Sequence, residues 1–99
     1  MSSPNRLFVV TRTRGPAWDG SQAMEEQSDW PAHAAFMDAL VNDGFVLLGG
    51  PLDGTPEVLL IVRSSDATSI EARLSADPWG QDMLRLTRIV AWTLRLGSL

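Results

Sequence analysis

Apolar and polar positions along the chain are grouped into segments, and the order of these segments predicts the fold. Runs rich in β-branched and apolar residues, bounded mostly by glycine, proline or aspartate, cover 6–13, 45–50, 57–63 and 86–96. Short runs with such boundaries are typical of strands. We therefore expect four strands, with the second and third joined as a hairpin through the turn at 53–56.

A first helix is expected between the first two strands, beginning at 29–31. Asp29 is a candidate N-cap there, and Pro31 suits the first turn, where its missing N–H needs no partner. Gly44 favours the helix end because glycine adopts the left-handed conformation without steric cost. An apolar stripe with spacings of three and four residues runs along this segment: His33, Phe36, Met37, Leu40 and Val41.

A second helix is expected between the third and fourth strands. Ser65 or Asp66 is suited to cap its start, and Pro78 disfavours helical geometry in the residue before it, so the helix should end near Ala76. The resulting order is β-α-β-β-α-β. This order predicts an α+β, ferredoxin-like domain with a four-stranded antiparallel sheet and two helices on one face.

The strands are apolar on both faces, which predicts a partner for the face that the helices leave open. Segments 45–50 and 57–63 are apolar at nearly every position, whereas a half-solvated antiparallel strand alternates. In the last strand we expect Leu86, Val90, Trp92, Leu94 and Leu96 on one side, and Ile89 and Ala91 on the other. Two sheets packed face to face about a two-fold axis would cover this surface, so we expect a homodimer, a dimeric α+β barrel.

Composition limits the class of protein. The 99 residues, 44% of them hydrophobic, predict a single domain over 1–99 with its core in about 7–96. The apolar runs are far shorter than the roughly 20 residues of a membrane span, and MSSPNRLFVV lacks the features of a secretory signal. We therefore expect a cytoplasmic protein without a membrane-spanning segment.

Charge and residue usage exclude further classes of function. The net charge is −4, and the eight arginines are scattered along the chain, which argues against nucleic-acid binding. The absence of cysteine and the single histidine argue against a zinc or iron centre. The sequence contains no P-loop, dinucleotide fingerprint or G-x-S-x-G motif, so we expect no cofactor.

His33 and Asp77 are the leading candidates for chemistry. His33 lies on the apolar stripe of the first helix and is therefore directed inward; it is either a general acid or base or a core histidine bonded to backbone carbonyls. Asp77, in Asp77-Pro78-Trp79, is either an ordinary helix N-cap or the partner that orients the imidazole. Both roles are compatible if one carboxylate oxygen caps the helix while the other forms a hydrogen bond with His33 Nδ1.

Further candidates are expected around a ligand pocket. Trp79 and Trp18 come from loops, where a large ring suits a pocket wall, whereas Trp92 is expected in core or dimer packing.

The remaining candidates each have a plainer alternative. Gly50 and Pro51 either let a ligand approach the backbone or simply end a strand. Arg12 and Arg14 either bind an anionic group of a substrate or are solvated at the surface.

Several motifs in order resemble the YCII-related (YciI-like) proteins. These are FVVTRTRGPAWD, EQSDWPAHAAFMDALVNDGFVLLGGPL with its G-x-x-x-x-G-G-P block at 44–51, and SADPWG, together covering about Leu7 to Leu96. The resemblance implies a dimeric α+β barrel and a His–Asp pair at His33 and Asp77. One relative in that family is a dehydrochlorinase that acts on a chlorinated hydroxyquinol without a cofactor.

Together these observations predict a small cofactor-independent enzyme. We expect lyase or isomerase chemistry on an aromatic or carbonyl compound, because one proton shuttle suffices for elimination or enolisation. His33 would move the proton and Asp77 would orient it. The alternative is a non-catalytic dimeric module that binds a small ligand, in which His33 is only part of a pocket wall.

Overall fold

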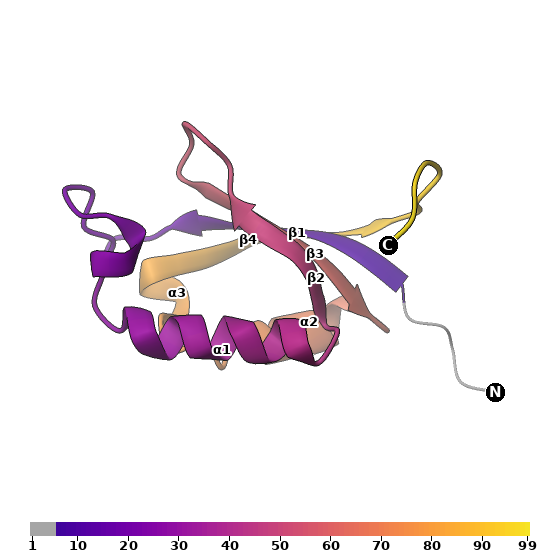
Figure 1. Cartoon of the computed structure of the whole chain (residues 1–99), viewed down its shortest axis with the longest axis horizontal. Helices are drawn as coiled ribbons and strands as arrows, with labels where there is room; N and C mark the ends of the chain where they lie inside the picture. Colours follow the sequence, from indigo (N-terminus) through magenta and orange to yellow (C-terminus); the bar gives the residue numbers. More distant parts are fainter. Residues whose placement is uncertain (1–5) are drawn as a thin grey trace.

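The computed structural model describes residues 6–99, in which one antiparallel sheet carries helices on one of its faces (Figure 1). The sheet contains β1 (Arg6–Arg14), β2 (Val46–Pro51), β3 (Glu57–Ser64) and β4 (Leu84–Trp92), in the spatial order β2-β3-β1-β4. The helices are α1 (Trp30–Asn42) and α2 (Ala67–Leu74), with the short η1 (Met24–Glu26) and α3 (Gly80–Met83) in the connections. The predicted β-α-β-β-α-β order and ferredoxin-like α+β fold are confirmed.

The helix boundaries follow the sequence signals in most places. Gly44 has φ +77° just beyond α1, as its role in ending the helix requires. The Asp66 carboxylate caps α2 by accepting a hydrogen bond from Ser69 N at 2.8 Å, although the helix ends at Leu74 rather than near Ala76. Asp29 occupies the N-cap position of α1 as expected, but its φ of 62° is left-handed and its side chain makes no capping hydrogen bond.

The main core lies between the sheet and the two longer helices. Alternate residues of β1 and β3 point into it, and helix residues cover them: Phe8, Val10, Leu60, Val62, Leu40, Ile70 and Leu74. A second, smaller apolar cluster of Trp79, Met83 and Leu84 lies around α3. The candidate site is built between these two clusters.

A β-bulge shifts the faces of β4. Thr11 pairs with Arg88 but Arg12 pairs with Leu86, so one additional residue of β4 is accommodated between them. Leu86 therefore packs against the helix-side core together with Ile89, whereas Val90 and Trp92 pair with residues of the opposite face. The expectation that Leu86 shares a face with Val90 was wrong, because the sequence pattern gives no sign of the bulge.

The face of the sheet away from the helices is apolar along its centre. The strand register places one residue from each strand in a single row across all four strands: Leu48, Ile61, Val9 and Val90. Leu48 and Val90 are 55% and 38% exposed, and Trp92, on the same face, is 39% exposed. Within residues 6–99, no helix has both the length and the apolar character that crossing a membrane requires.

A close backbone approach attaches the end of β1 to α3. Gly15 N donates to Met83 O at 2.9 Å, and Ala17 N donates to Asp82 O at 2.9 Å. A Cβ at Gly15 would lie 2.2 Å from Asp82 O, so this contact requires glycine. The contact holds the segment after Asp77 against β1.

Candidate functional site

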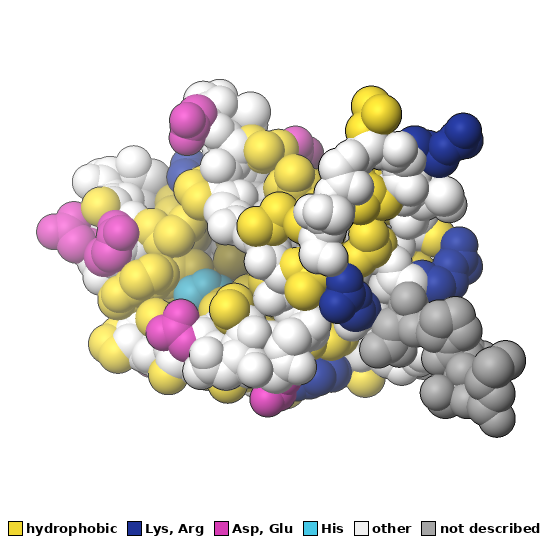
Figure 2. Space-filling model, turned by 45° about the vertical axis from the view of Figure 1, so that its right-hand side comes forward, with side chains coloured by type: hydrophobic (Ala, Val, Ile, Leu, Met, Phe, Trp, Pro, Cys, Tyr) yellow, Lys and Arg dark blue, Asp and Glu magenta, His cyan; other side chains and the backbone are white. Residues whose placement is uncertain are grey.

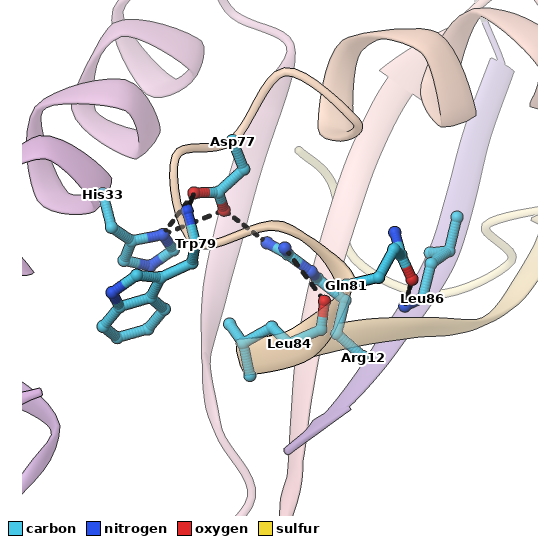
Figure 3. Close-up of polar contacts among 7 residues, drawn as sticks. All are labelled: Arg12, His33, Asp77, Trp79, Gln81, Leu84 and Leu86. Atoms are coloured by element: carbon cyan, nitrogen blue, oxygen red, sulfur yellow. Dashed lines mark hydrogen bonds and ion pairs between the residues drawn. The ribbon is translucent and has the colours of Figure 1, made fainter. Parts of the chain in front are cut away.

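His33 and Asp77, 44 positions apart in the chain, are in direct contact (Figure 3). His33 lies in the first turn of α1, and Asp77 lies in the connection between α2 and α3. His33 Nδ1 is 2.9 Å from both Oδ1 and Oδ2 of Asp77, and both residues are buried. The structure thus brings together the two residues that the sequence analysis singled out.

The Asp77 carboxylate also holds its own turn. Its Oδ1 accepts a hydrogen bond from Trp79 N at 2.9 Å, and Gly80 N donates to the Asp77 carbonyl at 3.0 Å. The following helix begins at Gly80 with Trp79 in the cap position, so Asp77 is not the N-cap of α3. The turn leaves both carboxylate oxygens directed at partners from other elements.

Arg12 is the second partner of Asp77. Its Nη1 donates to Asp77 Oδ2 at 2.9 Å and its Nη2 donates to Leu84 O at 3.3 Å. Arg12 is only 1% exposed. The alternative that Arg12 is solvated at the surface is therefore wrong, and its guanidinium is directed at Asp77 rather than at the cavity beside His33. Arg14 is exposed instead, and its guanidinium lies over the Trp18 ring, 4.6 Å from the centroid.

The environment of Asp77 fixes its ionisation. Burial raises the pKa of Asp77, but hydrogen bonds from His33, Trp79 N and Arg12 outweigh burial and hold the pKa below its ordinary value. The carboxylate is therefore ionised at neutral pH and accepts hydrogen bonds only. It follows that the proton between the two residues resides on His33 Nδ1.

His33 Nε2 is the ring nitrogen that Asp77 does not contact. It has no hydrogen bond within residues 6–99. Among the buried side-chain nitrogen and oxygen atoms of this part of the chain, only Arg12 Nε lacks a partner, so Nε2 retains contact with open space. Asp77 orients the imidazole ring through Nδ1, and Nε2 is not engaged by the protein. Nε2 is therefore suited to accept or deliver a proton.

Trp79 covers one face of the imidazole. The two rings are stacked, with centroids 3.7 Å apart and an interplanar angle of 8°. Trp79 Nε1 donates to Ser28 O at 2.6 Å, and Trp18 meets the Trp79 ring edge-on with centroids 5.5 Å apart. Trp79 and Trp18 were expected to form pocket walls for a ligand, but neither lines the cavity beside His33; Trp79 stacks on the imidazole, and Trp18 packs against Trp79.

A cavity of about 180 Å³ opens on another side of His33. Figure 2 shows the histidine in a hollow bordered by hydrophobic side chains. Gly50 and Pro51 are among its lining residues, and Pro51 is also the last residue of β2, so both alternatives from the sequence analysis remain open. Most of the other walls are apolar side chains: Met24, Met37, Val46, Val58, Leu60 and Leu84.

Two residues that the sequence analysis did not single out support the site. Gln27 is buried, and its amide accepts from Asp19 N at 3.0 Å and donates to Asp19 O at 2.8 Å, which fixes the loop that carries Met24. Trp30 is tilted against His33, with ring centroids 5.9 Å apart. The three-residue spacing of Trp30 and His33 is a usable signal for a shared helix face, whereas no local pattern identifies Gln27.

Metal ligands are not assembled at this site. Within residues 6–99, no three or more histidine, cysteine, aspartate or glutamate side chains lie close enough together to hold a metal ion. Comparisons of the chain with protein-family models, with curated proteins and with solved structures find no match.

Replacing Asp77 with Asn tests the electrostatics of the cluster. The change leaves Arg12 buried without its anion, so we expect the free energy of unfolding at pH 7 to fall by about 3–5 kcal/mol. Because folding holds the pKa of Asp77 below its ordinary value of 3.8, the stability from this carboxylate is complete above about pH 4 and is lost as the pH falls through the folded pKa. Denaturant unfolding from pH 7 to pH 3 measures both effects.

The same substitution at Asp53, in an exposed turn, is the control and should change stability far less. The difference between wild type and Asp77→Asn should remain constant down to about pH 4 and shrink below it. If the two proteins have equal free energies of unfolding at pH 7, or if their difference already shrinks between pH 7 and pH 5, the assigned ionisation of Asp77 is contradicted.

Proposed function

We propose that the chain is a cofactor-independent enzyme that moves a proton on a small aromatic or carbonyl compound, in a reaction of the lyase or isomerase type. The observation that carries the proposal is the buried contact between His33 Nδ1 and Asp77 beside an apolar cavity. His33 is the general acid or base, and Asp77 orients it.

The chemistry requires only one proton-transfer group. Nε2 takes a proton from a carbon next to a carbonyl, and the electron pair of the broken C–H bond forms a C=C bond of an enolate. If the enolate is conjugated with a second C=C bond, return of the proton to the far carbon completes an isomerisation. If the neighbouring carbon carries a leaving group, that group departs with its bonding electron pair, and Nε2 then releases the proton to the leaving group or to water, which completes an elimination. The imidazolium formed on the way lies against the Asp77 carboxylate, which stabilises its charge.

The resemblance to the YCII-related proteins supports the same role. It implies a His–Asp pair at His33 and Asp77 and a dehydrochlorinase among the relatives, whose elimination uses no cofactor. The geometry derived above suits this chemistry without depending on the resemblance.

We further propose that the chain functions as a homodimer, with the second copy packed on the open face of the sheet. The row of Leu48, Ile61, Val9 and Val90 crosses the middle of that face, where an interface core is expected. On the same face β3 carries Glu57 near one end and Arg63 near the other. Antiparallel stacking of two β3 strands about a two-fold axis therefore places unlike charges opposite each other.

Exchange of acidic C–H protons tests the catalytic proposal without knowledge of the natural substrate. We expect the wild type to accelerate deuterium incorporation next to the carbonyl of cyclopentanone or cyclohexanone in D₂O, followed by proton NMR with no cofactor added. His33→Ala should lower the enzyme-dependent rate by about 10²–10⁴-fold, because it removes the general base.

Thr68→Ala, an exposed change on α2, is the matched control and should keep the wild-type rate. Equal rates for wild type and His33→Ala would contradict the catalytic proposal and favour the ligand-binding module.

Light scattering at micromolar concentration tests the dimer. The wild type should have twice the mass of one chain, and Val90→Glu should halve that mass by placing a charge in the middle of the interface. Val41, 51% exposed on the helix side, provides the matched control, since Val41→Glu should leave the dimer intact. A monomeric wild type, or the same behaviour of both variants, would contradict the proposal.

A further inference from the structure

We propose that the cavity beside His33 selects an uncharged molecule about the size of a single ring and excludes anions. The inference rests on the proposed function, because it assigns a ligand class to the same site. Three observations carry it: the volume of the cavity, the chemistry of its walls and the distribution of charge along the chain.

The volume sets the size of the ligand. The cavity measures about 180 Å³. An apolar cavity of about 150 Å³ is enough to hold benzene. A single five- or six-membered ring with a small substituent therefore fills the cavity beside His33.

The walls hold no lysine, arginine or carboxylate to pair with a charged ligand. Among residues 6–99, His33 is the only lining residue with a polar side chain; the others are aliphatic residues, methionines, glycines and a proline. Transfer of an ion from water to such walls is costly unless a counter-charge meets it. Arg12, the cation of the cluster, is buried against Asp77, and Arg14 lies over Trp18, outside the lining of the cavity.

The segment of the chain that forms most of the cavity wall is acidic. Between Arg14 and Arg63 the sequence contains no lysine or arginine but eight acidic residues: Asp19, Glu25, Glu26, Asp29, Asp38, Asp43, Asp53 and Glu57. This stretch supplies every lining residue except Leu84. Acidic side chains are visible beside and below the hollow in Figure 2. Asp43 is paired with Arg73 at 2.8 Å, and the field of the other seven carboxylates disfavours an approaching anion.

Three probes of nearly equal shape separate charge from size: benzamide is neutral, benzoate is an anion and benzamidinium is a cation. Methionine methyl groups report the binding place, because Met24 and Met37 line the cavity whereas Met83 does not. In NMR titrations of protein labelled at the methionine methyls, benzamide should shift Met24 and Met37 but not Met83. Benzoate and benzamidinium should bind at least tenfold more weakly.

A charge introduced at the rim tests the cause of the selectivity. Val41 lines the cavity and is half exposed, so Val41→Arg places a cation at the entrance without disturbing the core. This variant should raise the affinity for benzoate relative to benzamide by about tenfold. Thr68→Arg adds the same charge on α2, away from the cavity, and should leave the ratio unchanged.

Each outcome decides the proposal. Preferential binding of benzamide at Met24 and Met37, reversed toward benzoate by Val41→Arg, supports it. Benzoate binding as tightly as benzamide in the wild type, or no probe shifting these two methyls, overturns it. Benzamide binding together with ketone exchange that is equal in wild type and His33→Ala would contradict the catalytic proposal and leave the ligand class standing.

Discussion

The Asp77 carboxylate lies between a guanidinium and an imidazole, and the rest of the site depends on this bridge. It joins β1, through Arg12, to α1, through His33, and its own backbone turn carries Trp79 onto the imidazole face. Breaking a buried ionic contact of this kind is expensive because the remaining charge loses its partner. Arg12 already neutralises the carboxylate, so the cluster stays electrically balanced while His33 Nε2 is unprotonated and able to act as a base.

The fold separates this chemistry from the open face of the sheet. The helix side of the sheet holds Arg12, the core and the cavity, whereas the opposite side carries the apolar row proposed to pack against a second copy. β2 contributes to both sides, because Gly49, Gly50 and Pro51 line the cavity beside His33 and also a hollow on the open face. Gly49, Gly50 and Pro51, which carry no large side chains, therefore separate the cavity beside His33 from the proposed dimer interface.

Much of the fold and part of the site can be predicted from the sequence. The stripe through His33 fixed its inward direction, and helix-ending signals at Gly44 and capping signals at Asp66 gave correct boundaries. The partnership of Arg12 was missed, although Phe8, Val10 and Arg12 alternate on one strand face and so indicate an inward arginine. The β4 bulge was not predicted, because the alternation of apolar residues does not show where one extra residue enters the strand.

The tautomer of His33 tests the central claim most directly, and the single histidine makes the measurement unambiguous. Two-bond ¹H–¹⁵N NMR correlations of the imidazole distinguish a proton on Nδ1 from a proton on Nε2. At a pH where the ring is neutral, the bridge predicts Nδ1 protonated and Nε2 unprotonated in the wild type, because the ionised Asp77 carboxylate only accepts. A ring protonated mainly at Nε2 would contradict the account, since Nδ1 would then face the carboxylate without a proton to donate.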